Sequence, residues 1–104
     1  MAEVVLITRP QYDGGRTALR VRTLLRDMPY REIFDDTEEA ELLVTKARAK
    51  HSLGDIPMLL VTNGDEVVSV ETLKLDNVAE QVITIYEVVE HLENPDPVDQ
   101  IQAS

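Results

Sequence analysis

Arginines and a glycine pair cluster near the start of the chain, and these are residue types that bind anions. The segment Asp13-Gly14-Gly15-Arg16 falls at the expected start of a helix, where free backbone N–H groups and the helix dipole favour a negative charge. Arg9 and Arg20 can add charge-assisted hydrogen bonds, and Arg16 and Arg20 share one helix face because they are four residues apart. We interpret this cluster as a site for a small anion, a peptide C-terminus or the acidic side chain of a partner protein. The alternative is structural: Asp13 caps the helix and the glycines only make the turn.

Residues for thiol, metal or covalent catalysis are missing or unsuitably spaced. The chain has no cysteine, which excludes thiol–disulfide oxidoreductase activity, disulfides, thiolate zinc sites and iron–sulfur ligation. His51 and His91 fall in different expected elements without a ligand partner at helical spacing, which favours surface histidines over a metal site. No Ser–His–acid set can be paired by spacing, and residues 13–16 lack the lysine and outer glycine of a P-loop. The sequence therefore predicts no catalytic residue and no metal ligand.

Length and charge favour one acidic globular domain. The 104 residues suit a single core, and a hydrophobic content of 43% argues against disorder. The net charge of −10 lies in residues 51–104, which hold one base and eleven acids, whereas residues 1–50 hold nine of each. This charge opposes nucleic-acid binding and leaves the first half as the end that can attract anions. No apolar run is long enough for a membrane span, and the N-terminus lacks the pattern of a secretory signal, so we expect a cytoplasmic protein.

Hydrophobic periodicity predicts alternating strands and helices that would position these residues. Val4-Val5-Leu6-Ile7 is typical of a strand buried on both faces, Pro29 ends the first helix, and Asn63-Gly64 is a strong hairpin signal. The expected order is a strand at 3–8, a helix at 16–28, a strand at 30–34, a helix after 35–39, strands at 56–61 and 66–70, a helix at about 75–92 and a flexible tail at 94–104. This order predicts one α/β domain over residues 1–93, with a mixed four-stranded sheet flanked by three helices.

The first and last helices differ in what they are expected to expose. Four arginines of the first helix should face solvent: Arg16, Arg20, Arg22 and Arg26. The last helix carries two apolar stripes, which exceed what one sheet face usually needs. The excess, Ile83, Tyr86 and Val88, is a candidate contact for a dimer or a partner protein. The alternative is that the sheet and the second helix bury it.

Three segments in order carry a resemblance to a known family. They are the strand and loop Leu6-Ile7-Thr8-Arg9-Pro10, the strand start Asp55-Ile56-Pro57-Met58-Leu59, and the hairpin Asn63-Gly64-Asp65 followed by a terminal helix. Over about residues 3–92 the chain resembles a glutaredoxin, a member of the thioredoxin-fold proteins. The resemblance implies a βαβαββα fold in which Pro57 is cis and faces the active site. It also implies that the backbone next to such a proline, at Ile56, pairs with an extended peptide.

The chain departs from the family at its reactive residues. The Cys-X-X-Cys motif would fall at Tyr12-Asp13-Gly14-Gly15, where no side chain can replace a thiolate. The Gly-Gly pair that holds glutathione in the family corresponds to Ser69-Val70-Glu71-Thr72, and only Pro57 and Asp76-Asn77 keep part of that pattern. Glutathione transferases share the fold and use a hydroxyl residue near the first strand, a role that Tyr12 could take. In these enzymes a helical second domain supplies the electrophile site, and we expect no such domain within residues 1–104.

The sequence thus favours a redox-inactive, noncatalytic glutaredoxin-like module that binds a protein partner or a small anion, without a cofactor. Its expected binding surface comprises Arg9, Tyr12, Asp13, Gly14, Gly15, Arg16, Arg20, Ile56 and Pro57. One alternative is a glutathione-binding, transferase-like enzyme centred on Tyr12. Another is a homodimeric structural component that associates through the last helix. Neither nucleic acid nor membrane is expected as a partner.

Overall fold

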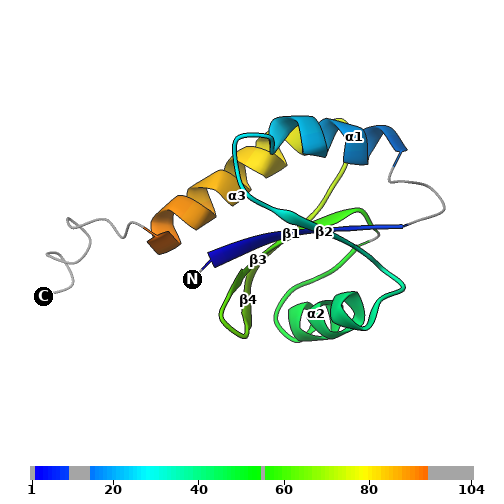
Figure 1. Cartoon of the computed structure of the whole chain (residues 1–104), viewed down its shortest axis with the longest axis vertical. Coiled ribbons are helices and arrows are strands. Elements are labelled where there is room, and N and C mark those ends of the chain that lie inside the picture. Colours follow the sequence, from blue (N-terminus) through cyan, green and yellow to red (C-terminus); the bar gives the residue numbers. More distant parts are fainter. Residues whose placement is uncertain (1, 10–14, 55, 94–104) are drawn as a thin grey trace, which may run out of the picture.

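The computed structural model describes residues 2–9, 15–54 and 56–93, which form an α/β domain with four strands and three helices (Figure 1). The elements in chain order are β1 (Ala2–Thr8), α1 (Gly15–Leu24), β2 (Arg31–Phe34), α2 (Glu38–Arg48), β3 (Met58–Asn63), β4 (Glu66–Thr72) and α3 (Val78–Glu93). The expected order and class of the elements are therefore confirmed. No helix in the described ranges combines the length and the apolar composition that crossing a membrane would require.

The four strands form one mixed sheet in the order β2-β1-β3-β4. Strand β1 pairs in parallel with β2, so that Ile7 lies opposite Ile33, and antiparallel with β3, so that Leu6 lies opposite Leu59. Strands β3 and β4 form an antiparallel hairpin. Its turn contains Gly64 at φ +65°, a conformation that glycine adopts without strain. The parallel β1–α1–β2 crossover and the hairpin both match the sequence-based expectation.

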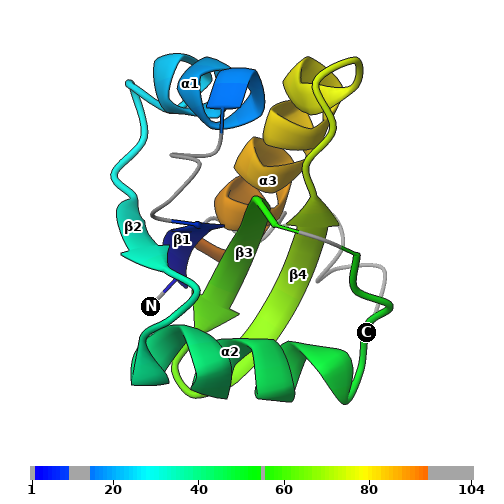
Figure 2. The same ribbon diagram turned by 90° about the vertical axis from the view of Figure 1, so that its right-hand side faces the viewer.

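Helices cover both faces of the sheet, with α1 and α3 on one face and α2 on the other (Figures 1 and 2). Successive residues of β1 therefore pack into different clusters. Val4 and Leu6 contact the cluster beneath α1 and α3, whereas Val5 and Ile7 contact the cluster beneath α2. All four side chains are buried, as expected for a strand covered on both faces. This alternation decides on which side of the sheet each residue of the candidate site lies.

Helix α2 has a capping residue at its start and charged residues in its first and last turns, as its sequence indicates. Thr37 is the N-cap, and its hydroxyl oxygen accepts a hydrogen bond from the backbone N–H of Ala40 at 3.2 Å. Glu38, Glu39 and Glu41 occupy the first turn, while Lys46 and Arg48 lie in the last, which suits the helix dipole at both ends.

Both of the other helices are shorter than their periodicity predicts. Helix α1 ends at Leu24, and the chain turns before Pro29; Met28 N–H donates to the Leu25 carbonyl at 2.9 Å in this turn. Helix α3 begins at Val78, not at about Leu75, because Lys74 to Asn77 form a turn closed by a 2.9 Å backbone hydrogen bond. Both turns contain apolar residues at the spacing of a helix. A prediction from periodicity alone therefore makes both helices too long.

Candidate functional site

A hollow of about 430 Å³ opens where β1 ends, on the α2 side of the sheet. Arg9 lines it from the end of β1, Asp35 from the end of β2, Arg48 from α2, and Gly54 and Ile56 from the segment that leads into β3. Other lining residues are Asp36, Glu41, Val44, Thr45 and Met58. The hollow thus brings together Arg9 and Ile56, which are far apart in the sequence and which the sequence placed in one binding surface.

Arg9 and Asp35 fix the rim of the hollow between the first two strands. The Nε of Arg9 donates to Oδ2 of Asp35 at 3.3 Å, and the Asp35 backbone N–H donates to the carbonyl of Thr8 at 2.9 Å. Arg48 is exposed and forms no hydrogen bond or ion pair with the residues that the structure describes. The rim therefore carries one neutralised pair and one guanidinium that faces solvent.

The segment entering β3 is held against β4 on both sides of Ile56. The Gly54 N–H donates to Oγ1 of Thr72 at 3.0 Å, and the carbonyl of Pro57 accepts from the Leu73 N–H at 3.0 Å. A Cβ at Gly54 would meet Cγ2 of Thr72 at 2.8 Å, so this close approach needs a glycine. The Ile56–Pro57 peptide bond is cis, as the glutaredoxin resemblance implies.

The backbone of Ile56 differs from that of Gly54 and Pro57 in having no hydrogen-bond partner among the described residues. Within the described parts of the chain, neither its N–H nor its carbonyl forms a hydrogen bond. Ile56 is half-buried and lines the hollow. Backbone groups left unpaired in this way offer hydrogen bonds to an added extended chain.

A second polar network lies on the opposite face of the sheet, beneath α1. Arg22 donates from both Nε and Nη2 to the carboxylate of Glu32, each at 2.7 Å, and the hydroxyl of buried Thr8 donates to the same carboxylate at 3.0 Å. The hydrogen bonds from Arg22 keep the pKa of Glu32 below its ordinary value, with a smaller contribution from Thr8. Arg22 was expected to face solvent; that expectation is wrong, because its side chain, 24% exposed, turns to β2 to pair with Glu32. The network ties α1 to the end of β1 that carries Arg9.

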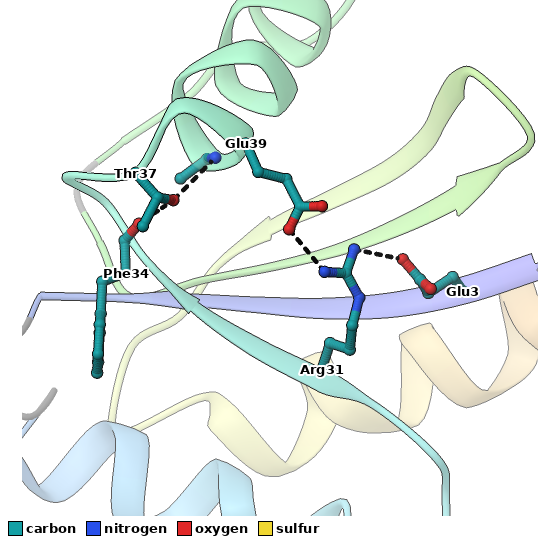
Figure 3. Close-up of polar contacts among 6 residues, drawn as sticks. Glu3, Arg31, Phe34, Thr37 and Glu39 are labelled. Atoms are coloured by element: carbon teal, nitrogen blue, oxygen red, sulfur yellow. Dashed lines mark hydrogen bonds and ion pairs between the residues drawn. The ribbon is translucent and has the colours of Figure 1, made fainter.

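Arg31 joins three elements on the α2 side (Figure 3). Its Nη1 donates to Glu39 at 2.6 Å and its Nη2 donates to Glu3 at 2.8 Å, so that one guanidinium links β2 with both α2 and β1. These bonds hold the pKa of Glu39 below its ordinary range and raise that of Arg31. All three side chains are nearly half exposed, so we assign them a role in orientation and little net stability.

The remaining residues of the expected surface do not join the hollow. Gly15 begins α1, and Arg16 and Arg20 are exposed on that helix, which covers the opposite face of the sheet. Pro57 adjoins the hollow through Ile56. Tyr12, Asp13 and Gly14 lie outside the described residues. Asp35, Arg48 and Gly54 line the hollow but were not expected from the sequence to be site residues. Their only sequence signal was that two of them lie at the end of a predicted element or just after it.

The three residues of α3 that were expected at an interface differ in how exposed they are. Ile83 is exposed, with 56% of its surface accessible. Tyr86 and Val88 are half-buried and pack against the cluster beneath α1 and α3, and the Tyr86 hydroxyl donates to the Leu24 carbonyl at 3.2 Å. Of these three residues, Ile83 alone is exposed.

Comparisons with protein-family models, with curated proteins and with solved structures find no match to this chain. Across the described residues, no three His, Asp or Glu side chains are grouped so that they could hold a metal ion.

Proposed function

We propose that this protein is a redox-inactive, noncatalytic module of the glutaredoxin type that binds an extended segment of a partner protein. The segment docks in the hollow between Arg9 and Ile56. The observation that carries this proposal is that the backbone of Ile56 has no hydrogen-bond partner among the described residues and borders a hollow large enough for several side chains. Binding of this kind requires no thiol, which agrees with a chain that has no cysteine.

The architecture supports the assignment to the thioredoxin fold. The element order βαβαββα and the strand order β2-β1-β3-β4 are compatible with that fold. Two of the three segments that carry the resemblance, at the end of β1 and before β3, lie on one hollow through Arg9 and Ile56. This is the juxtaposition that the proposed docking site needs.

The lining of the hollow fits a peptide better than a lone anion. Asp35, Asp36 and Glu41 contribute three carboxylates against the guanidinium groups of Arg9 and Arg48, so the net charge repels a free anion. Other lining side chains, Val44 and Met58, supply apolar contact. An extended peptide can pair its backbone with Ile56 while its side chains meet both charged and apolar positions.

Peptide selection followed by NMR tests the proposal. Peptides of about ten residues, an extended length of roughly 35 Å, are selected by phage display on the wild-type protein. The best is then synthesised and titrated into ¹⁵N-labelled protein. We expect the amide signals of Arg9, Thr45, Arg48 and Ile56 to shift. A parallel titration with glutathione tests the enzyme alternative, which requires shifts at Ile56 and Asp76.

Two matched tryptophan substitutions locate the site independently of the NMR assignment. Thr45 and Thr84 are both exposed helix residues whose hydroxyls donate to the carbonyl four residues earlier, but only Thr45 lines the hollow. Thr45→Trp should weaken peptide binding by about tenfold or more by filling the hollow, whereas Thr84→Trp should leave the affinity unchanged. Equal affinities of the two variants would refute the hollow as the docking site.

A further inference from the structure

Helices α1 and α3 lie side by side on one face of the sheet and run in the same direction (Figures 1 and 2). The shared direction follows from the topology, because β1 and β4 are both antiparallel to β3 and each is followed by a helix that returns across this face. The hydrogen bond from Tyr86 to Leu24 places the middle of α3 level with the end of α1. The outer surfaces of the two helices therefore form one continuous face.

The outer surface of α1 is basic. Arg16 and Arg20 on α1, and Arg26 in the turn that follows it, are exposed, and none of them forms an ion pair or a hydrogen bond with any residue in the described ranges. Helix α1 itself contains no acidic residue. Leu19 lies among these arginines with 63% of its surface accessible. Three arginines without a partner in the part of the chain that the structure describes are unexpected in a protein whose net charge is −10.

The outer surface of α3 is acidic, and its charged and apolar side chains are arranged like those of α1. Glu80, Glu87 and Glu90 are exposed there, and Ile83 lies among them. Tyr86 and Leu24 lie at about the same height along the parallel helix axes. At about 1.5 Å per residue, Ile83 then lies near the height of Leu19 and Arg20. Glu87 and Glu90 lie near the height of Arg26. Each helix thus presents one exposed aliphatic side chain flanked by charges, basic on α1 and acidic on α3.

We propose that this face binds a second copy of the chain, with α1 of each copy packed on α3 of the other. The two-fold axis of this dimer runs parallel to the helices, along the groove between them. It places α1 of one copy opposite α3 of the other, and residues at the same height along the helices face one another. Arg16 and Arg20 then meet the partner's Glu80, Leu19 meets the partner's Ile83, and Arg26 meets the partner's Glu87 and Glu90. A two-fold axis across the helices would instead place α1 on α1, where like charges repel.

Charge complementarity selects a second copy as the occupant. An isologous interface requires a surface that complements itself, and a basic helix beside an acidic helix of matching spacing meets that requirement. The dimer leaves the hollow on the α2 side open, so this inference stands or falls independently of peptide binding.

Sedimentation equilibrium of charge-reversed variants tests the dimer at about 10 µM to 1 mM protein. Wild type should dimerise in this range. Arg16→Glu, Arg20→Glu should be monomeric, because acids then face acids. Glu80→Arg, Glu87→Arg should also be monomeric, although this change lowers the net negative charge and so weakens general repulsion. A 1:1 mixture of the two variants should dimerise again, since both contacts then pair opposite charges.

The control carries the same charge change on the other face. Glu38→Arg, Glu41→Arg alters two exposed residues in the first turn of α2 and should remain dimeric. Circular dichroism checks that each variant keeps its helices. A wild-type protein that stays monomeric over the whole range, or a mixture that fails to recover the dimer, would overturn the proposal.

Discussion

Leu59→Ala is expected to lower the free energy of unfolding by about 2–5 kcal/mol. Leu59 lies in β3 next to β1 and is fully buried beneath α1 and α3. Removing its side chain loses the transfer free energy of the buried carbons and leaves a cavity that the packed helices close only partly. Domains of this size unfold with about 5–15 kcal/mol, so the loss is a large fraction of the total. Urea unfolding followed by circular dichroism measures it.

The control for this substitution is the same change on the protein surface. Leu42 lies on α2 with 55% of its surface accessible, so Leu42→Ala should change the free energy of unfolding by less than about 0.5 kcal/mol. Similar losses for both variants would contradict the assignment of Leu59 to the core.

Glu32→Gln is expected to lower the free energy of unfolding by about 1–2 kcal/mol at neutral pH. The glutamine keeps the size of the side chain but removes the charge that pairs with both Arg22 nitrogens, and it leaves a guanidinium that is only 24% exposed without its counterion. Glu39→Gln is the matched control. It breaks the exposed pair with Arg31 and should change stability little.

The pH dependence of the Glu32→Gln effect follows from the lowered pKa of Glu32. A carboxyl whose pKa is lower in the folded state stabilises that state fully above its unfolded value, here 4.5, and loses this contribution as the pH falls through the folded value. The difference in unfolding free energy between wild type and variant should therefore be constant above about pH 5 and should shrink below pH 4.5. A difference that stays constant down to about pH 3 would show that folding does not lower the pKa of Glu32.

Local sequence signals predict the elements of this fold well. The β-branched run at Val4 to Ile7 indicates a doubly covered strand, the acids after Thr37 indicate a capped helix, and Asn63-Gly64 indicates the hairpin. Each signal depends on residues within a few positions of one another. Helix ends are less well predicted, since the turns after Leu24 and before Val78 keep apolar residues at helical spacing.

The site could be predicted only in part, because it depends on contacts between distant segments. The expected binding surface includes Arg9 and Ile56, which both line the hollow, but it also groups Arg9 with Arg16 and Arg20, which do not. The structure places Arg9 on the hollow at the α2 side, whereas α1 covers the other face. Similarly, the arginines of α1 look equivalent in sequence, yet Arg22 alone meets a carboxylate on β2. Neither outcome follows from spacing along the chain.

The amide exchange rate of Ile56 tests the proposed function most directly. Its N–H has no internal partner in the described structure, so we expect fast exchange in the free protein. With the selected peptide at saturation, this rate should fall by about tenfold or more, as expected when a hydrogen bond worth about 1.4 kcal/mol forms. Unchanged exchange at Ile56, with protection appearing on α1 or α3 instead, would contradict docking of an extended segment in the hollow.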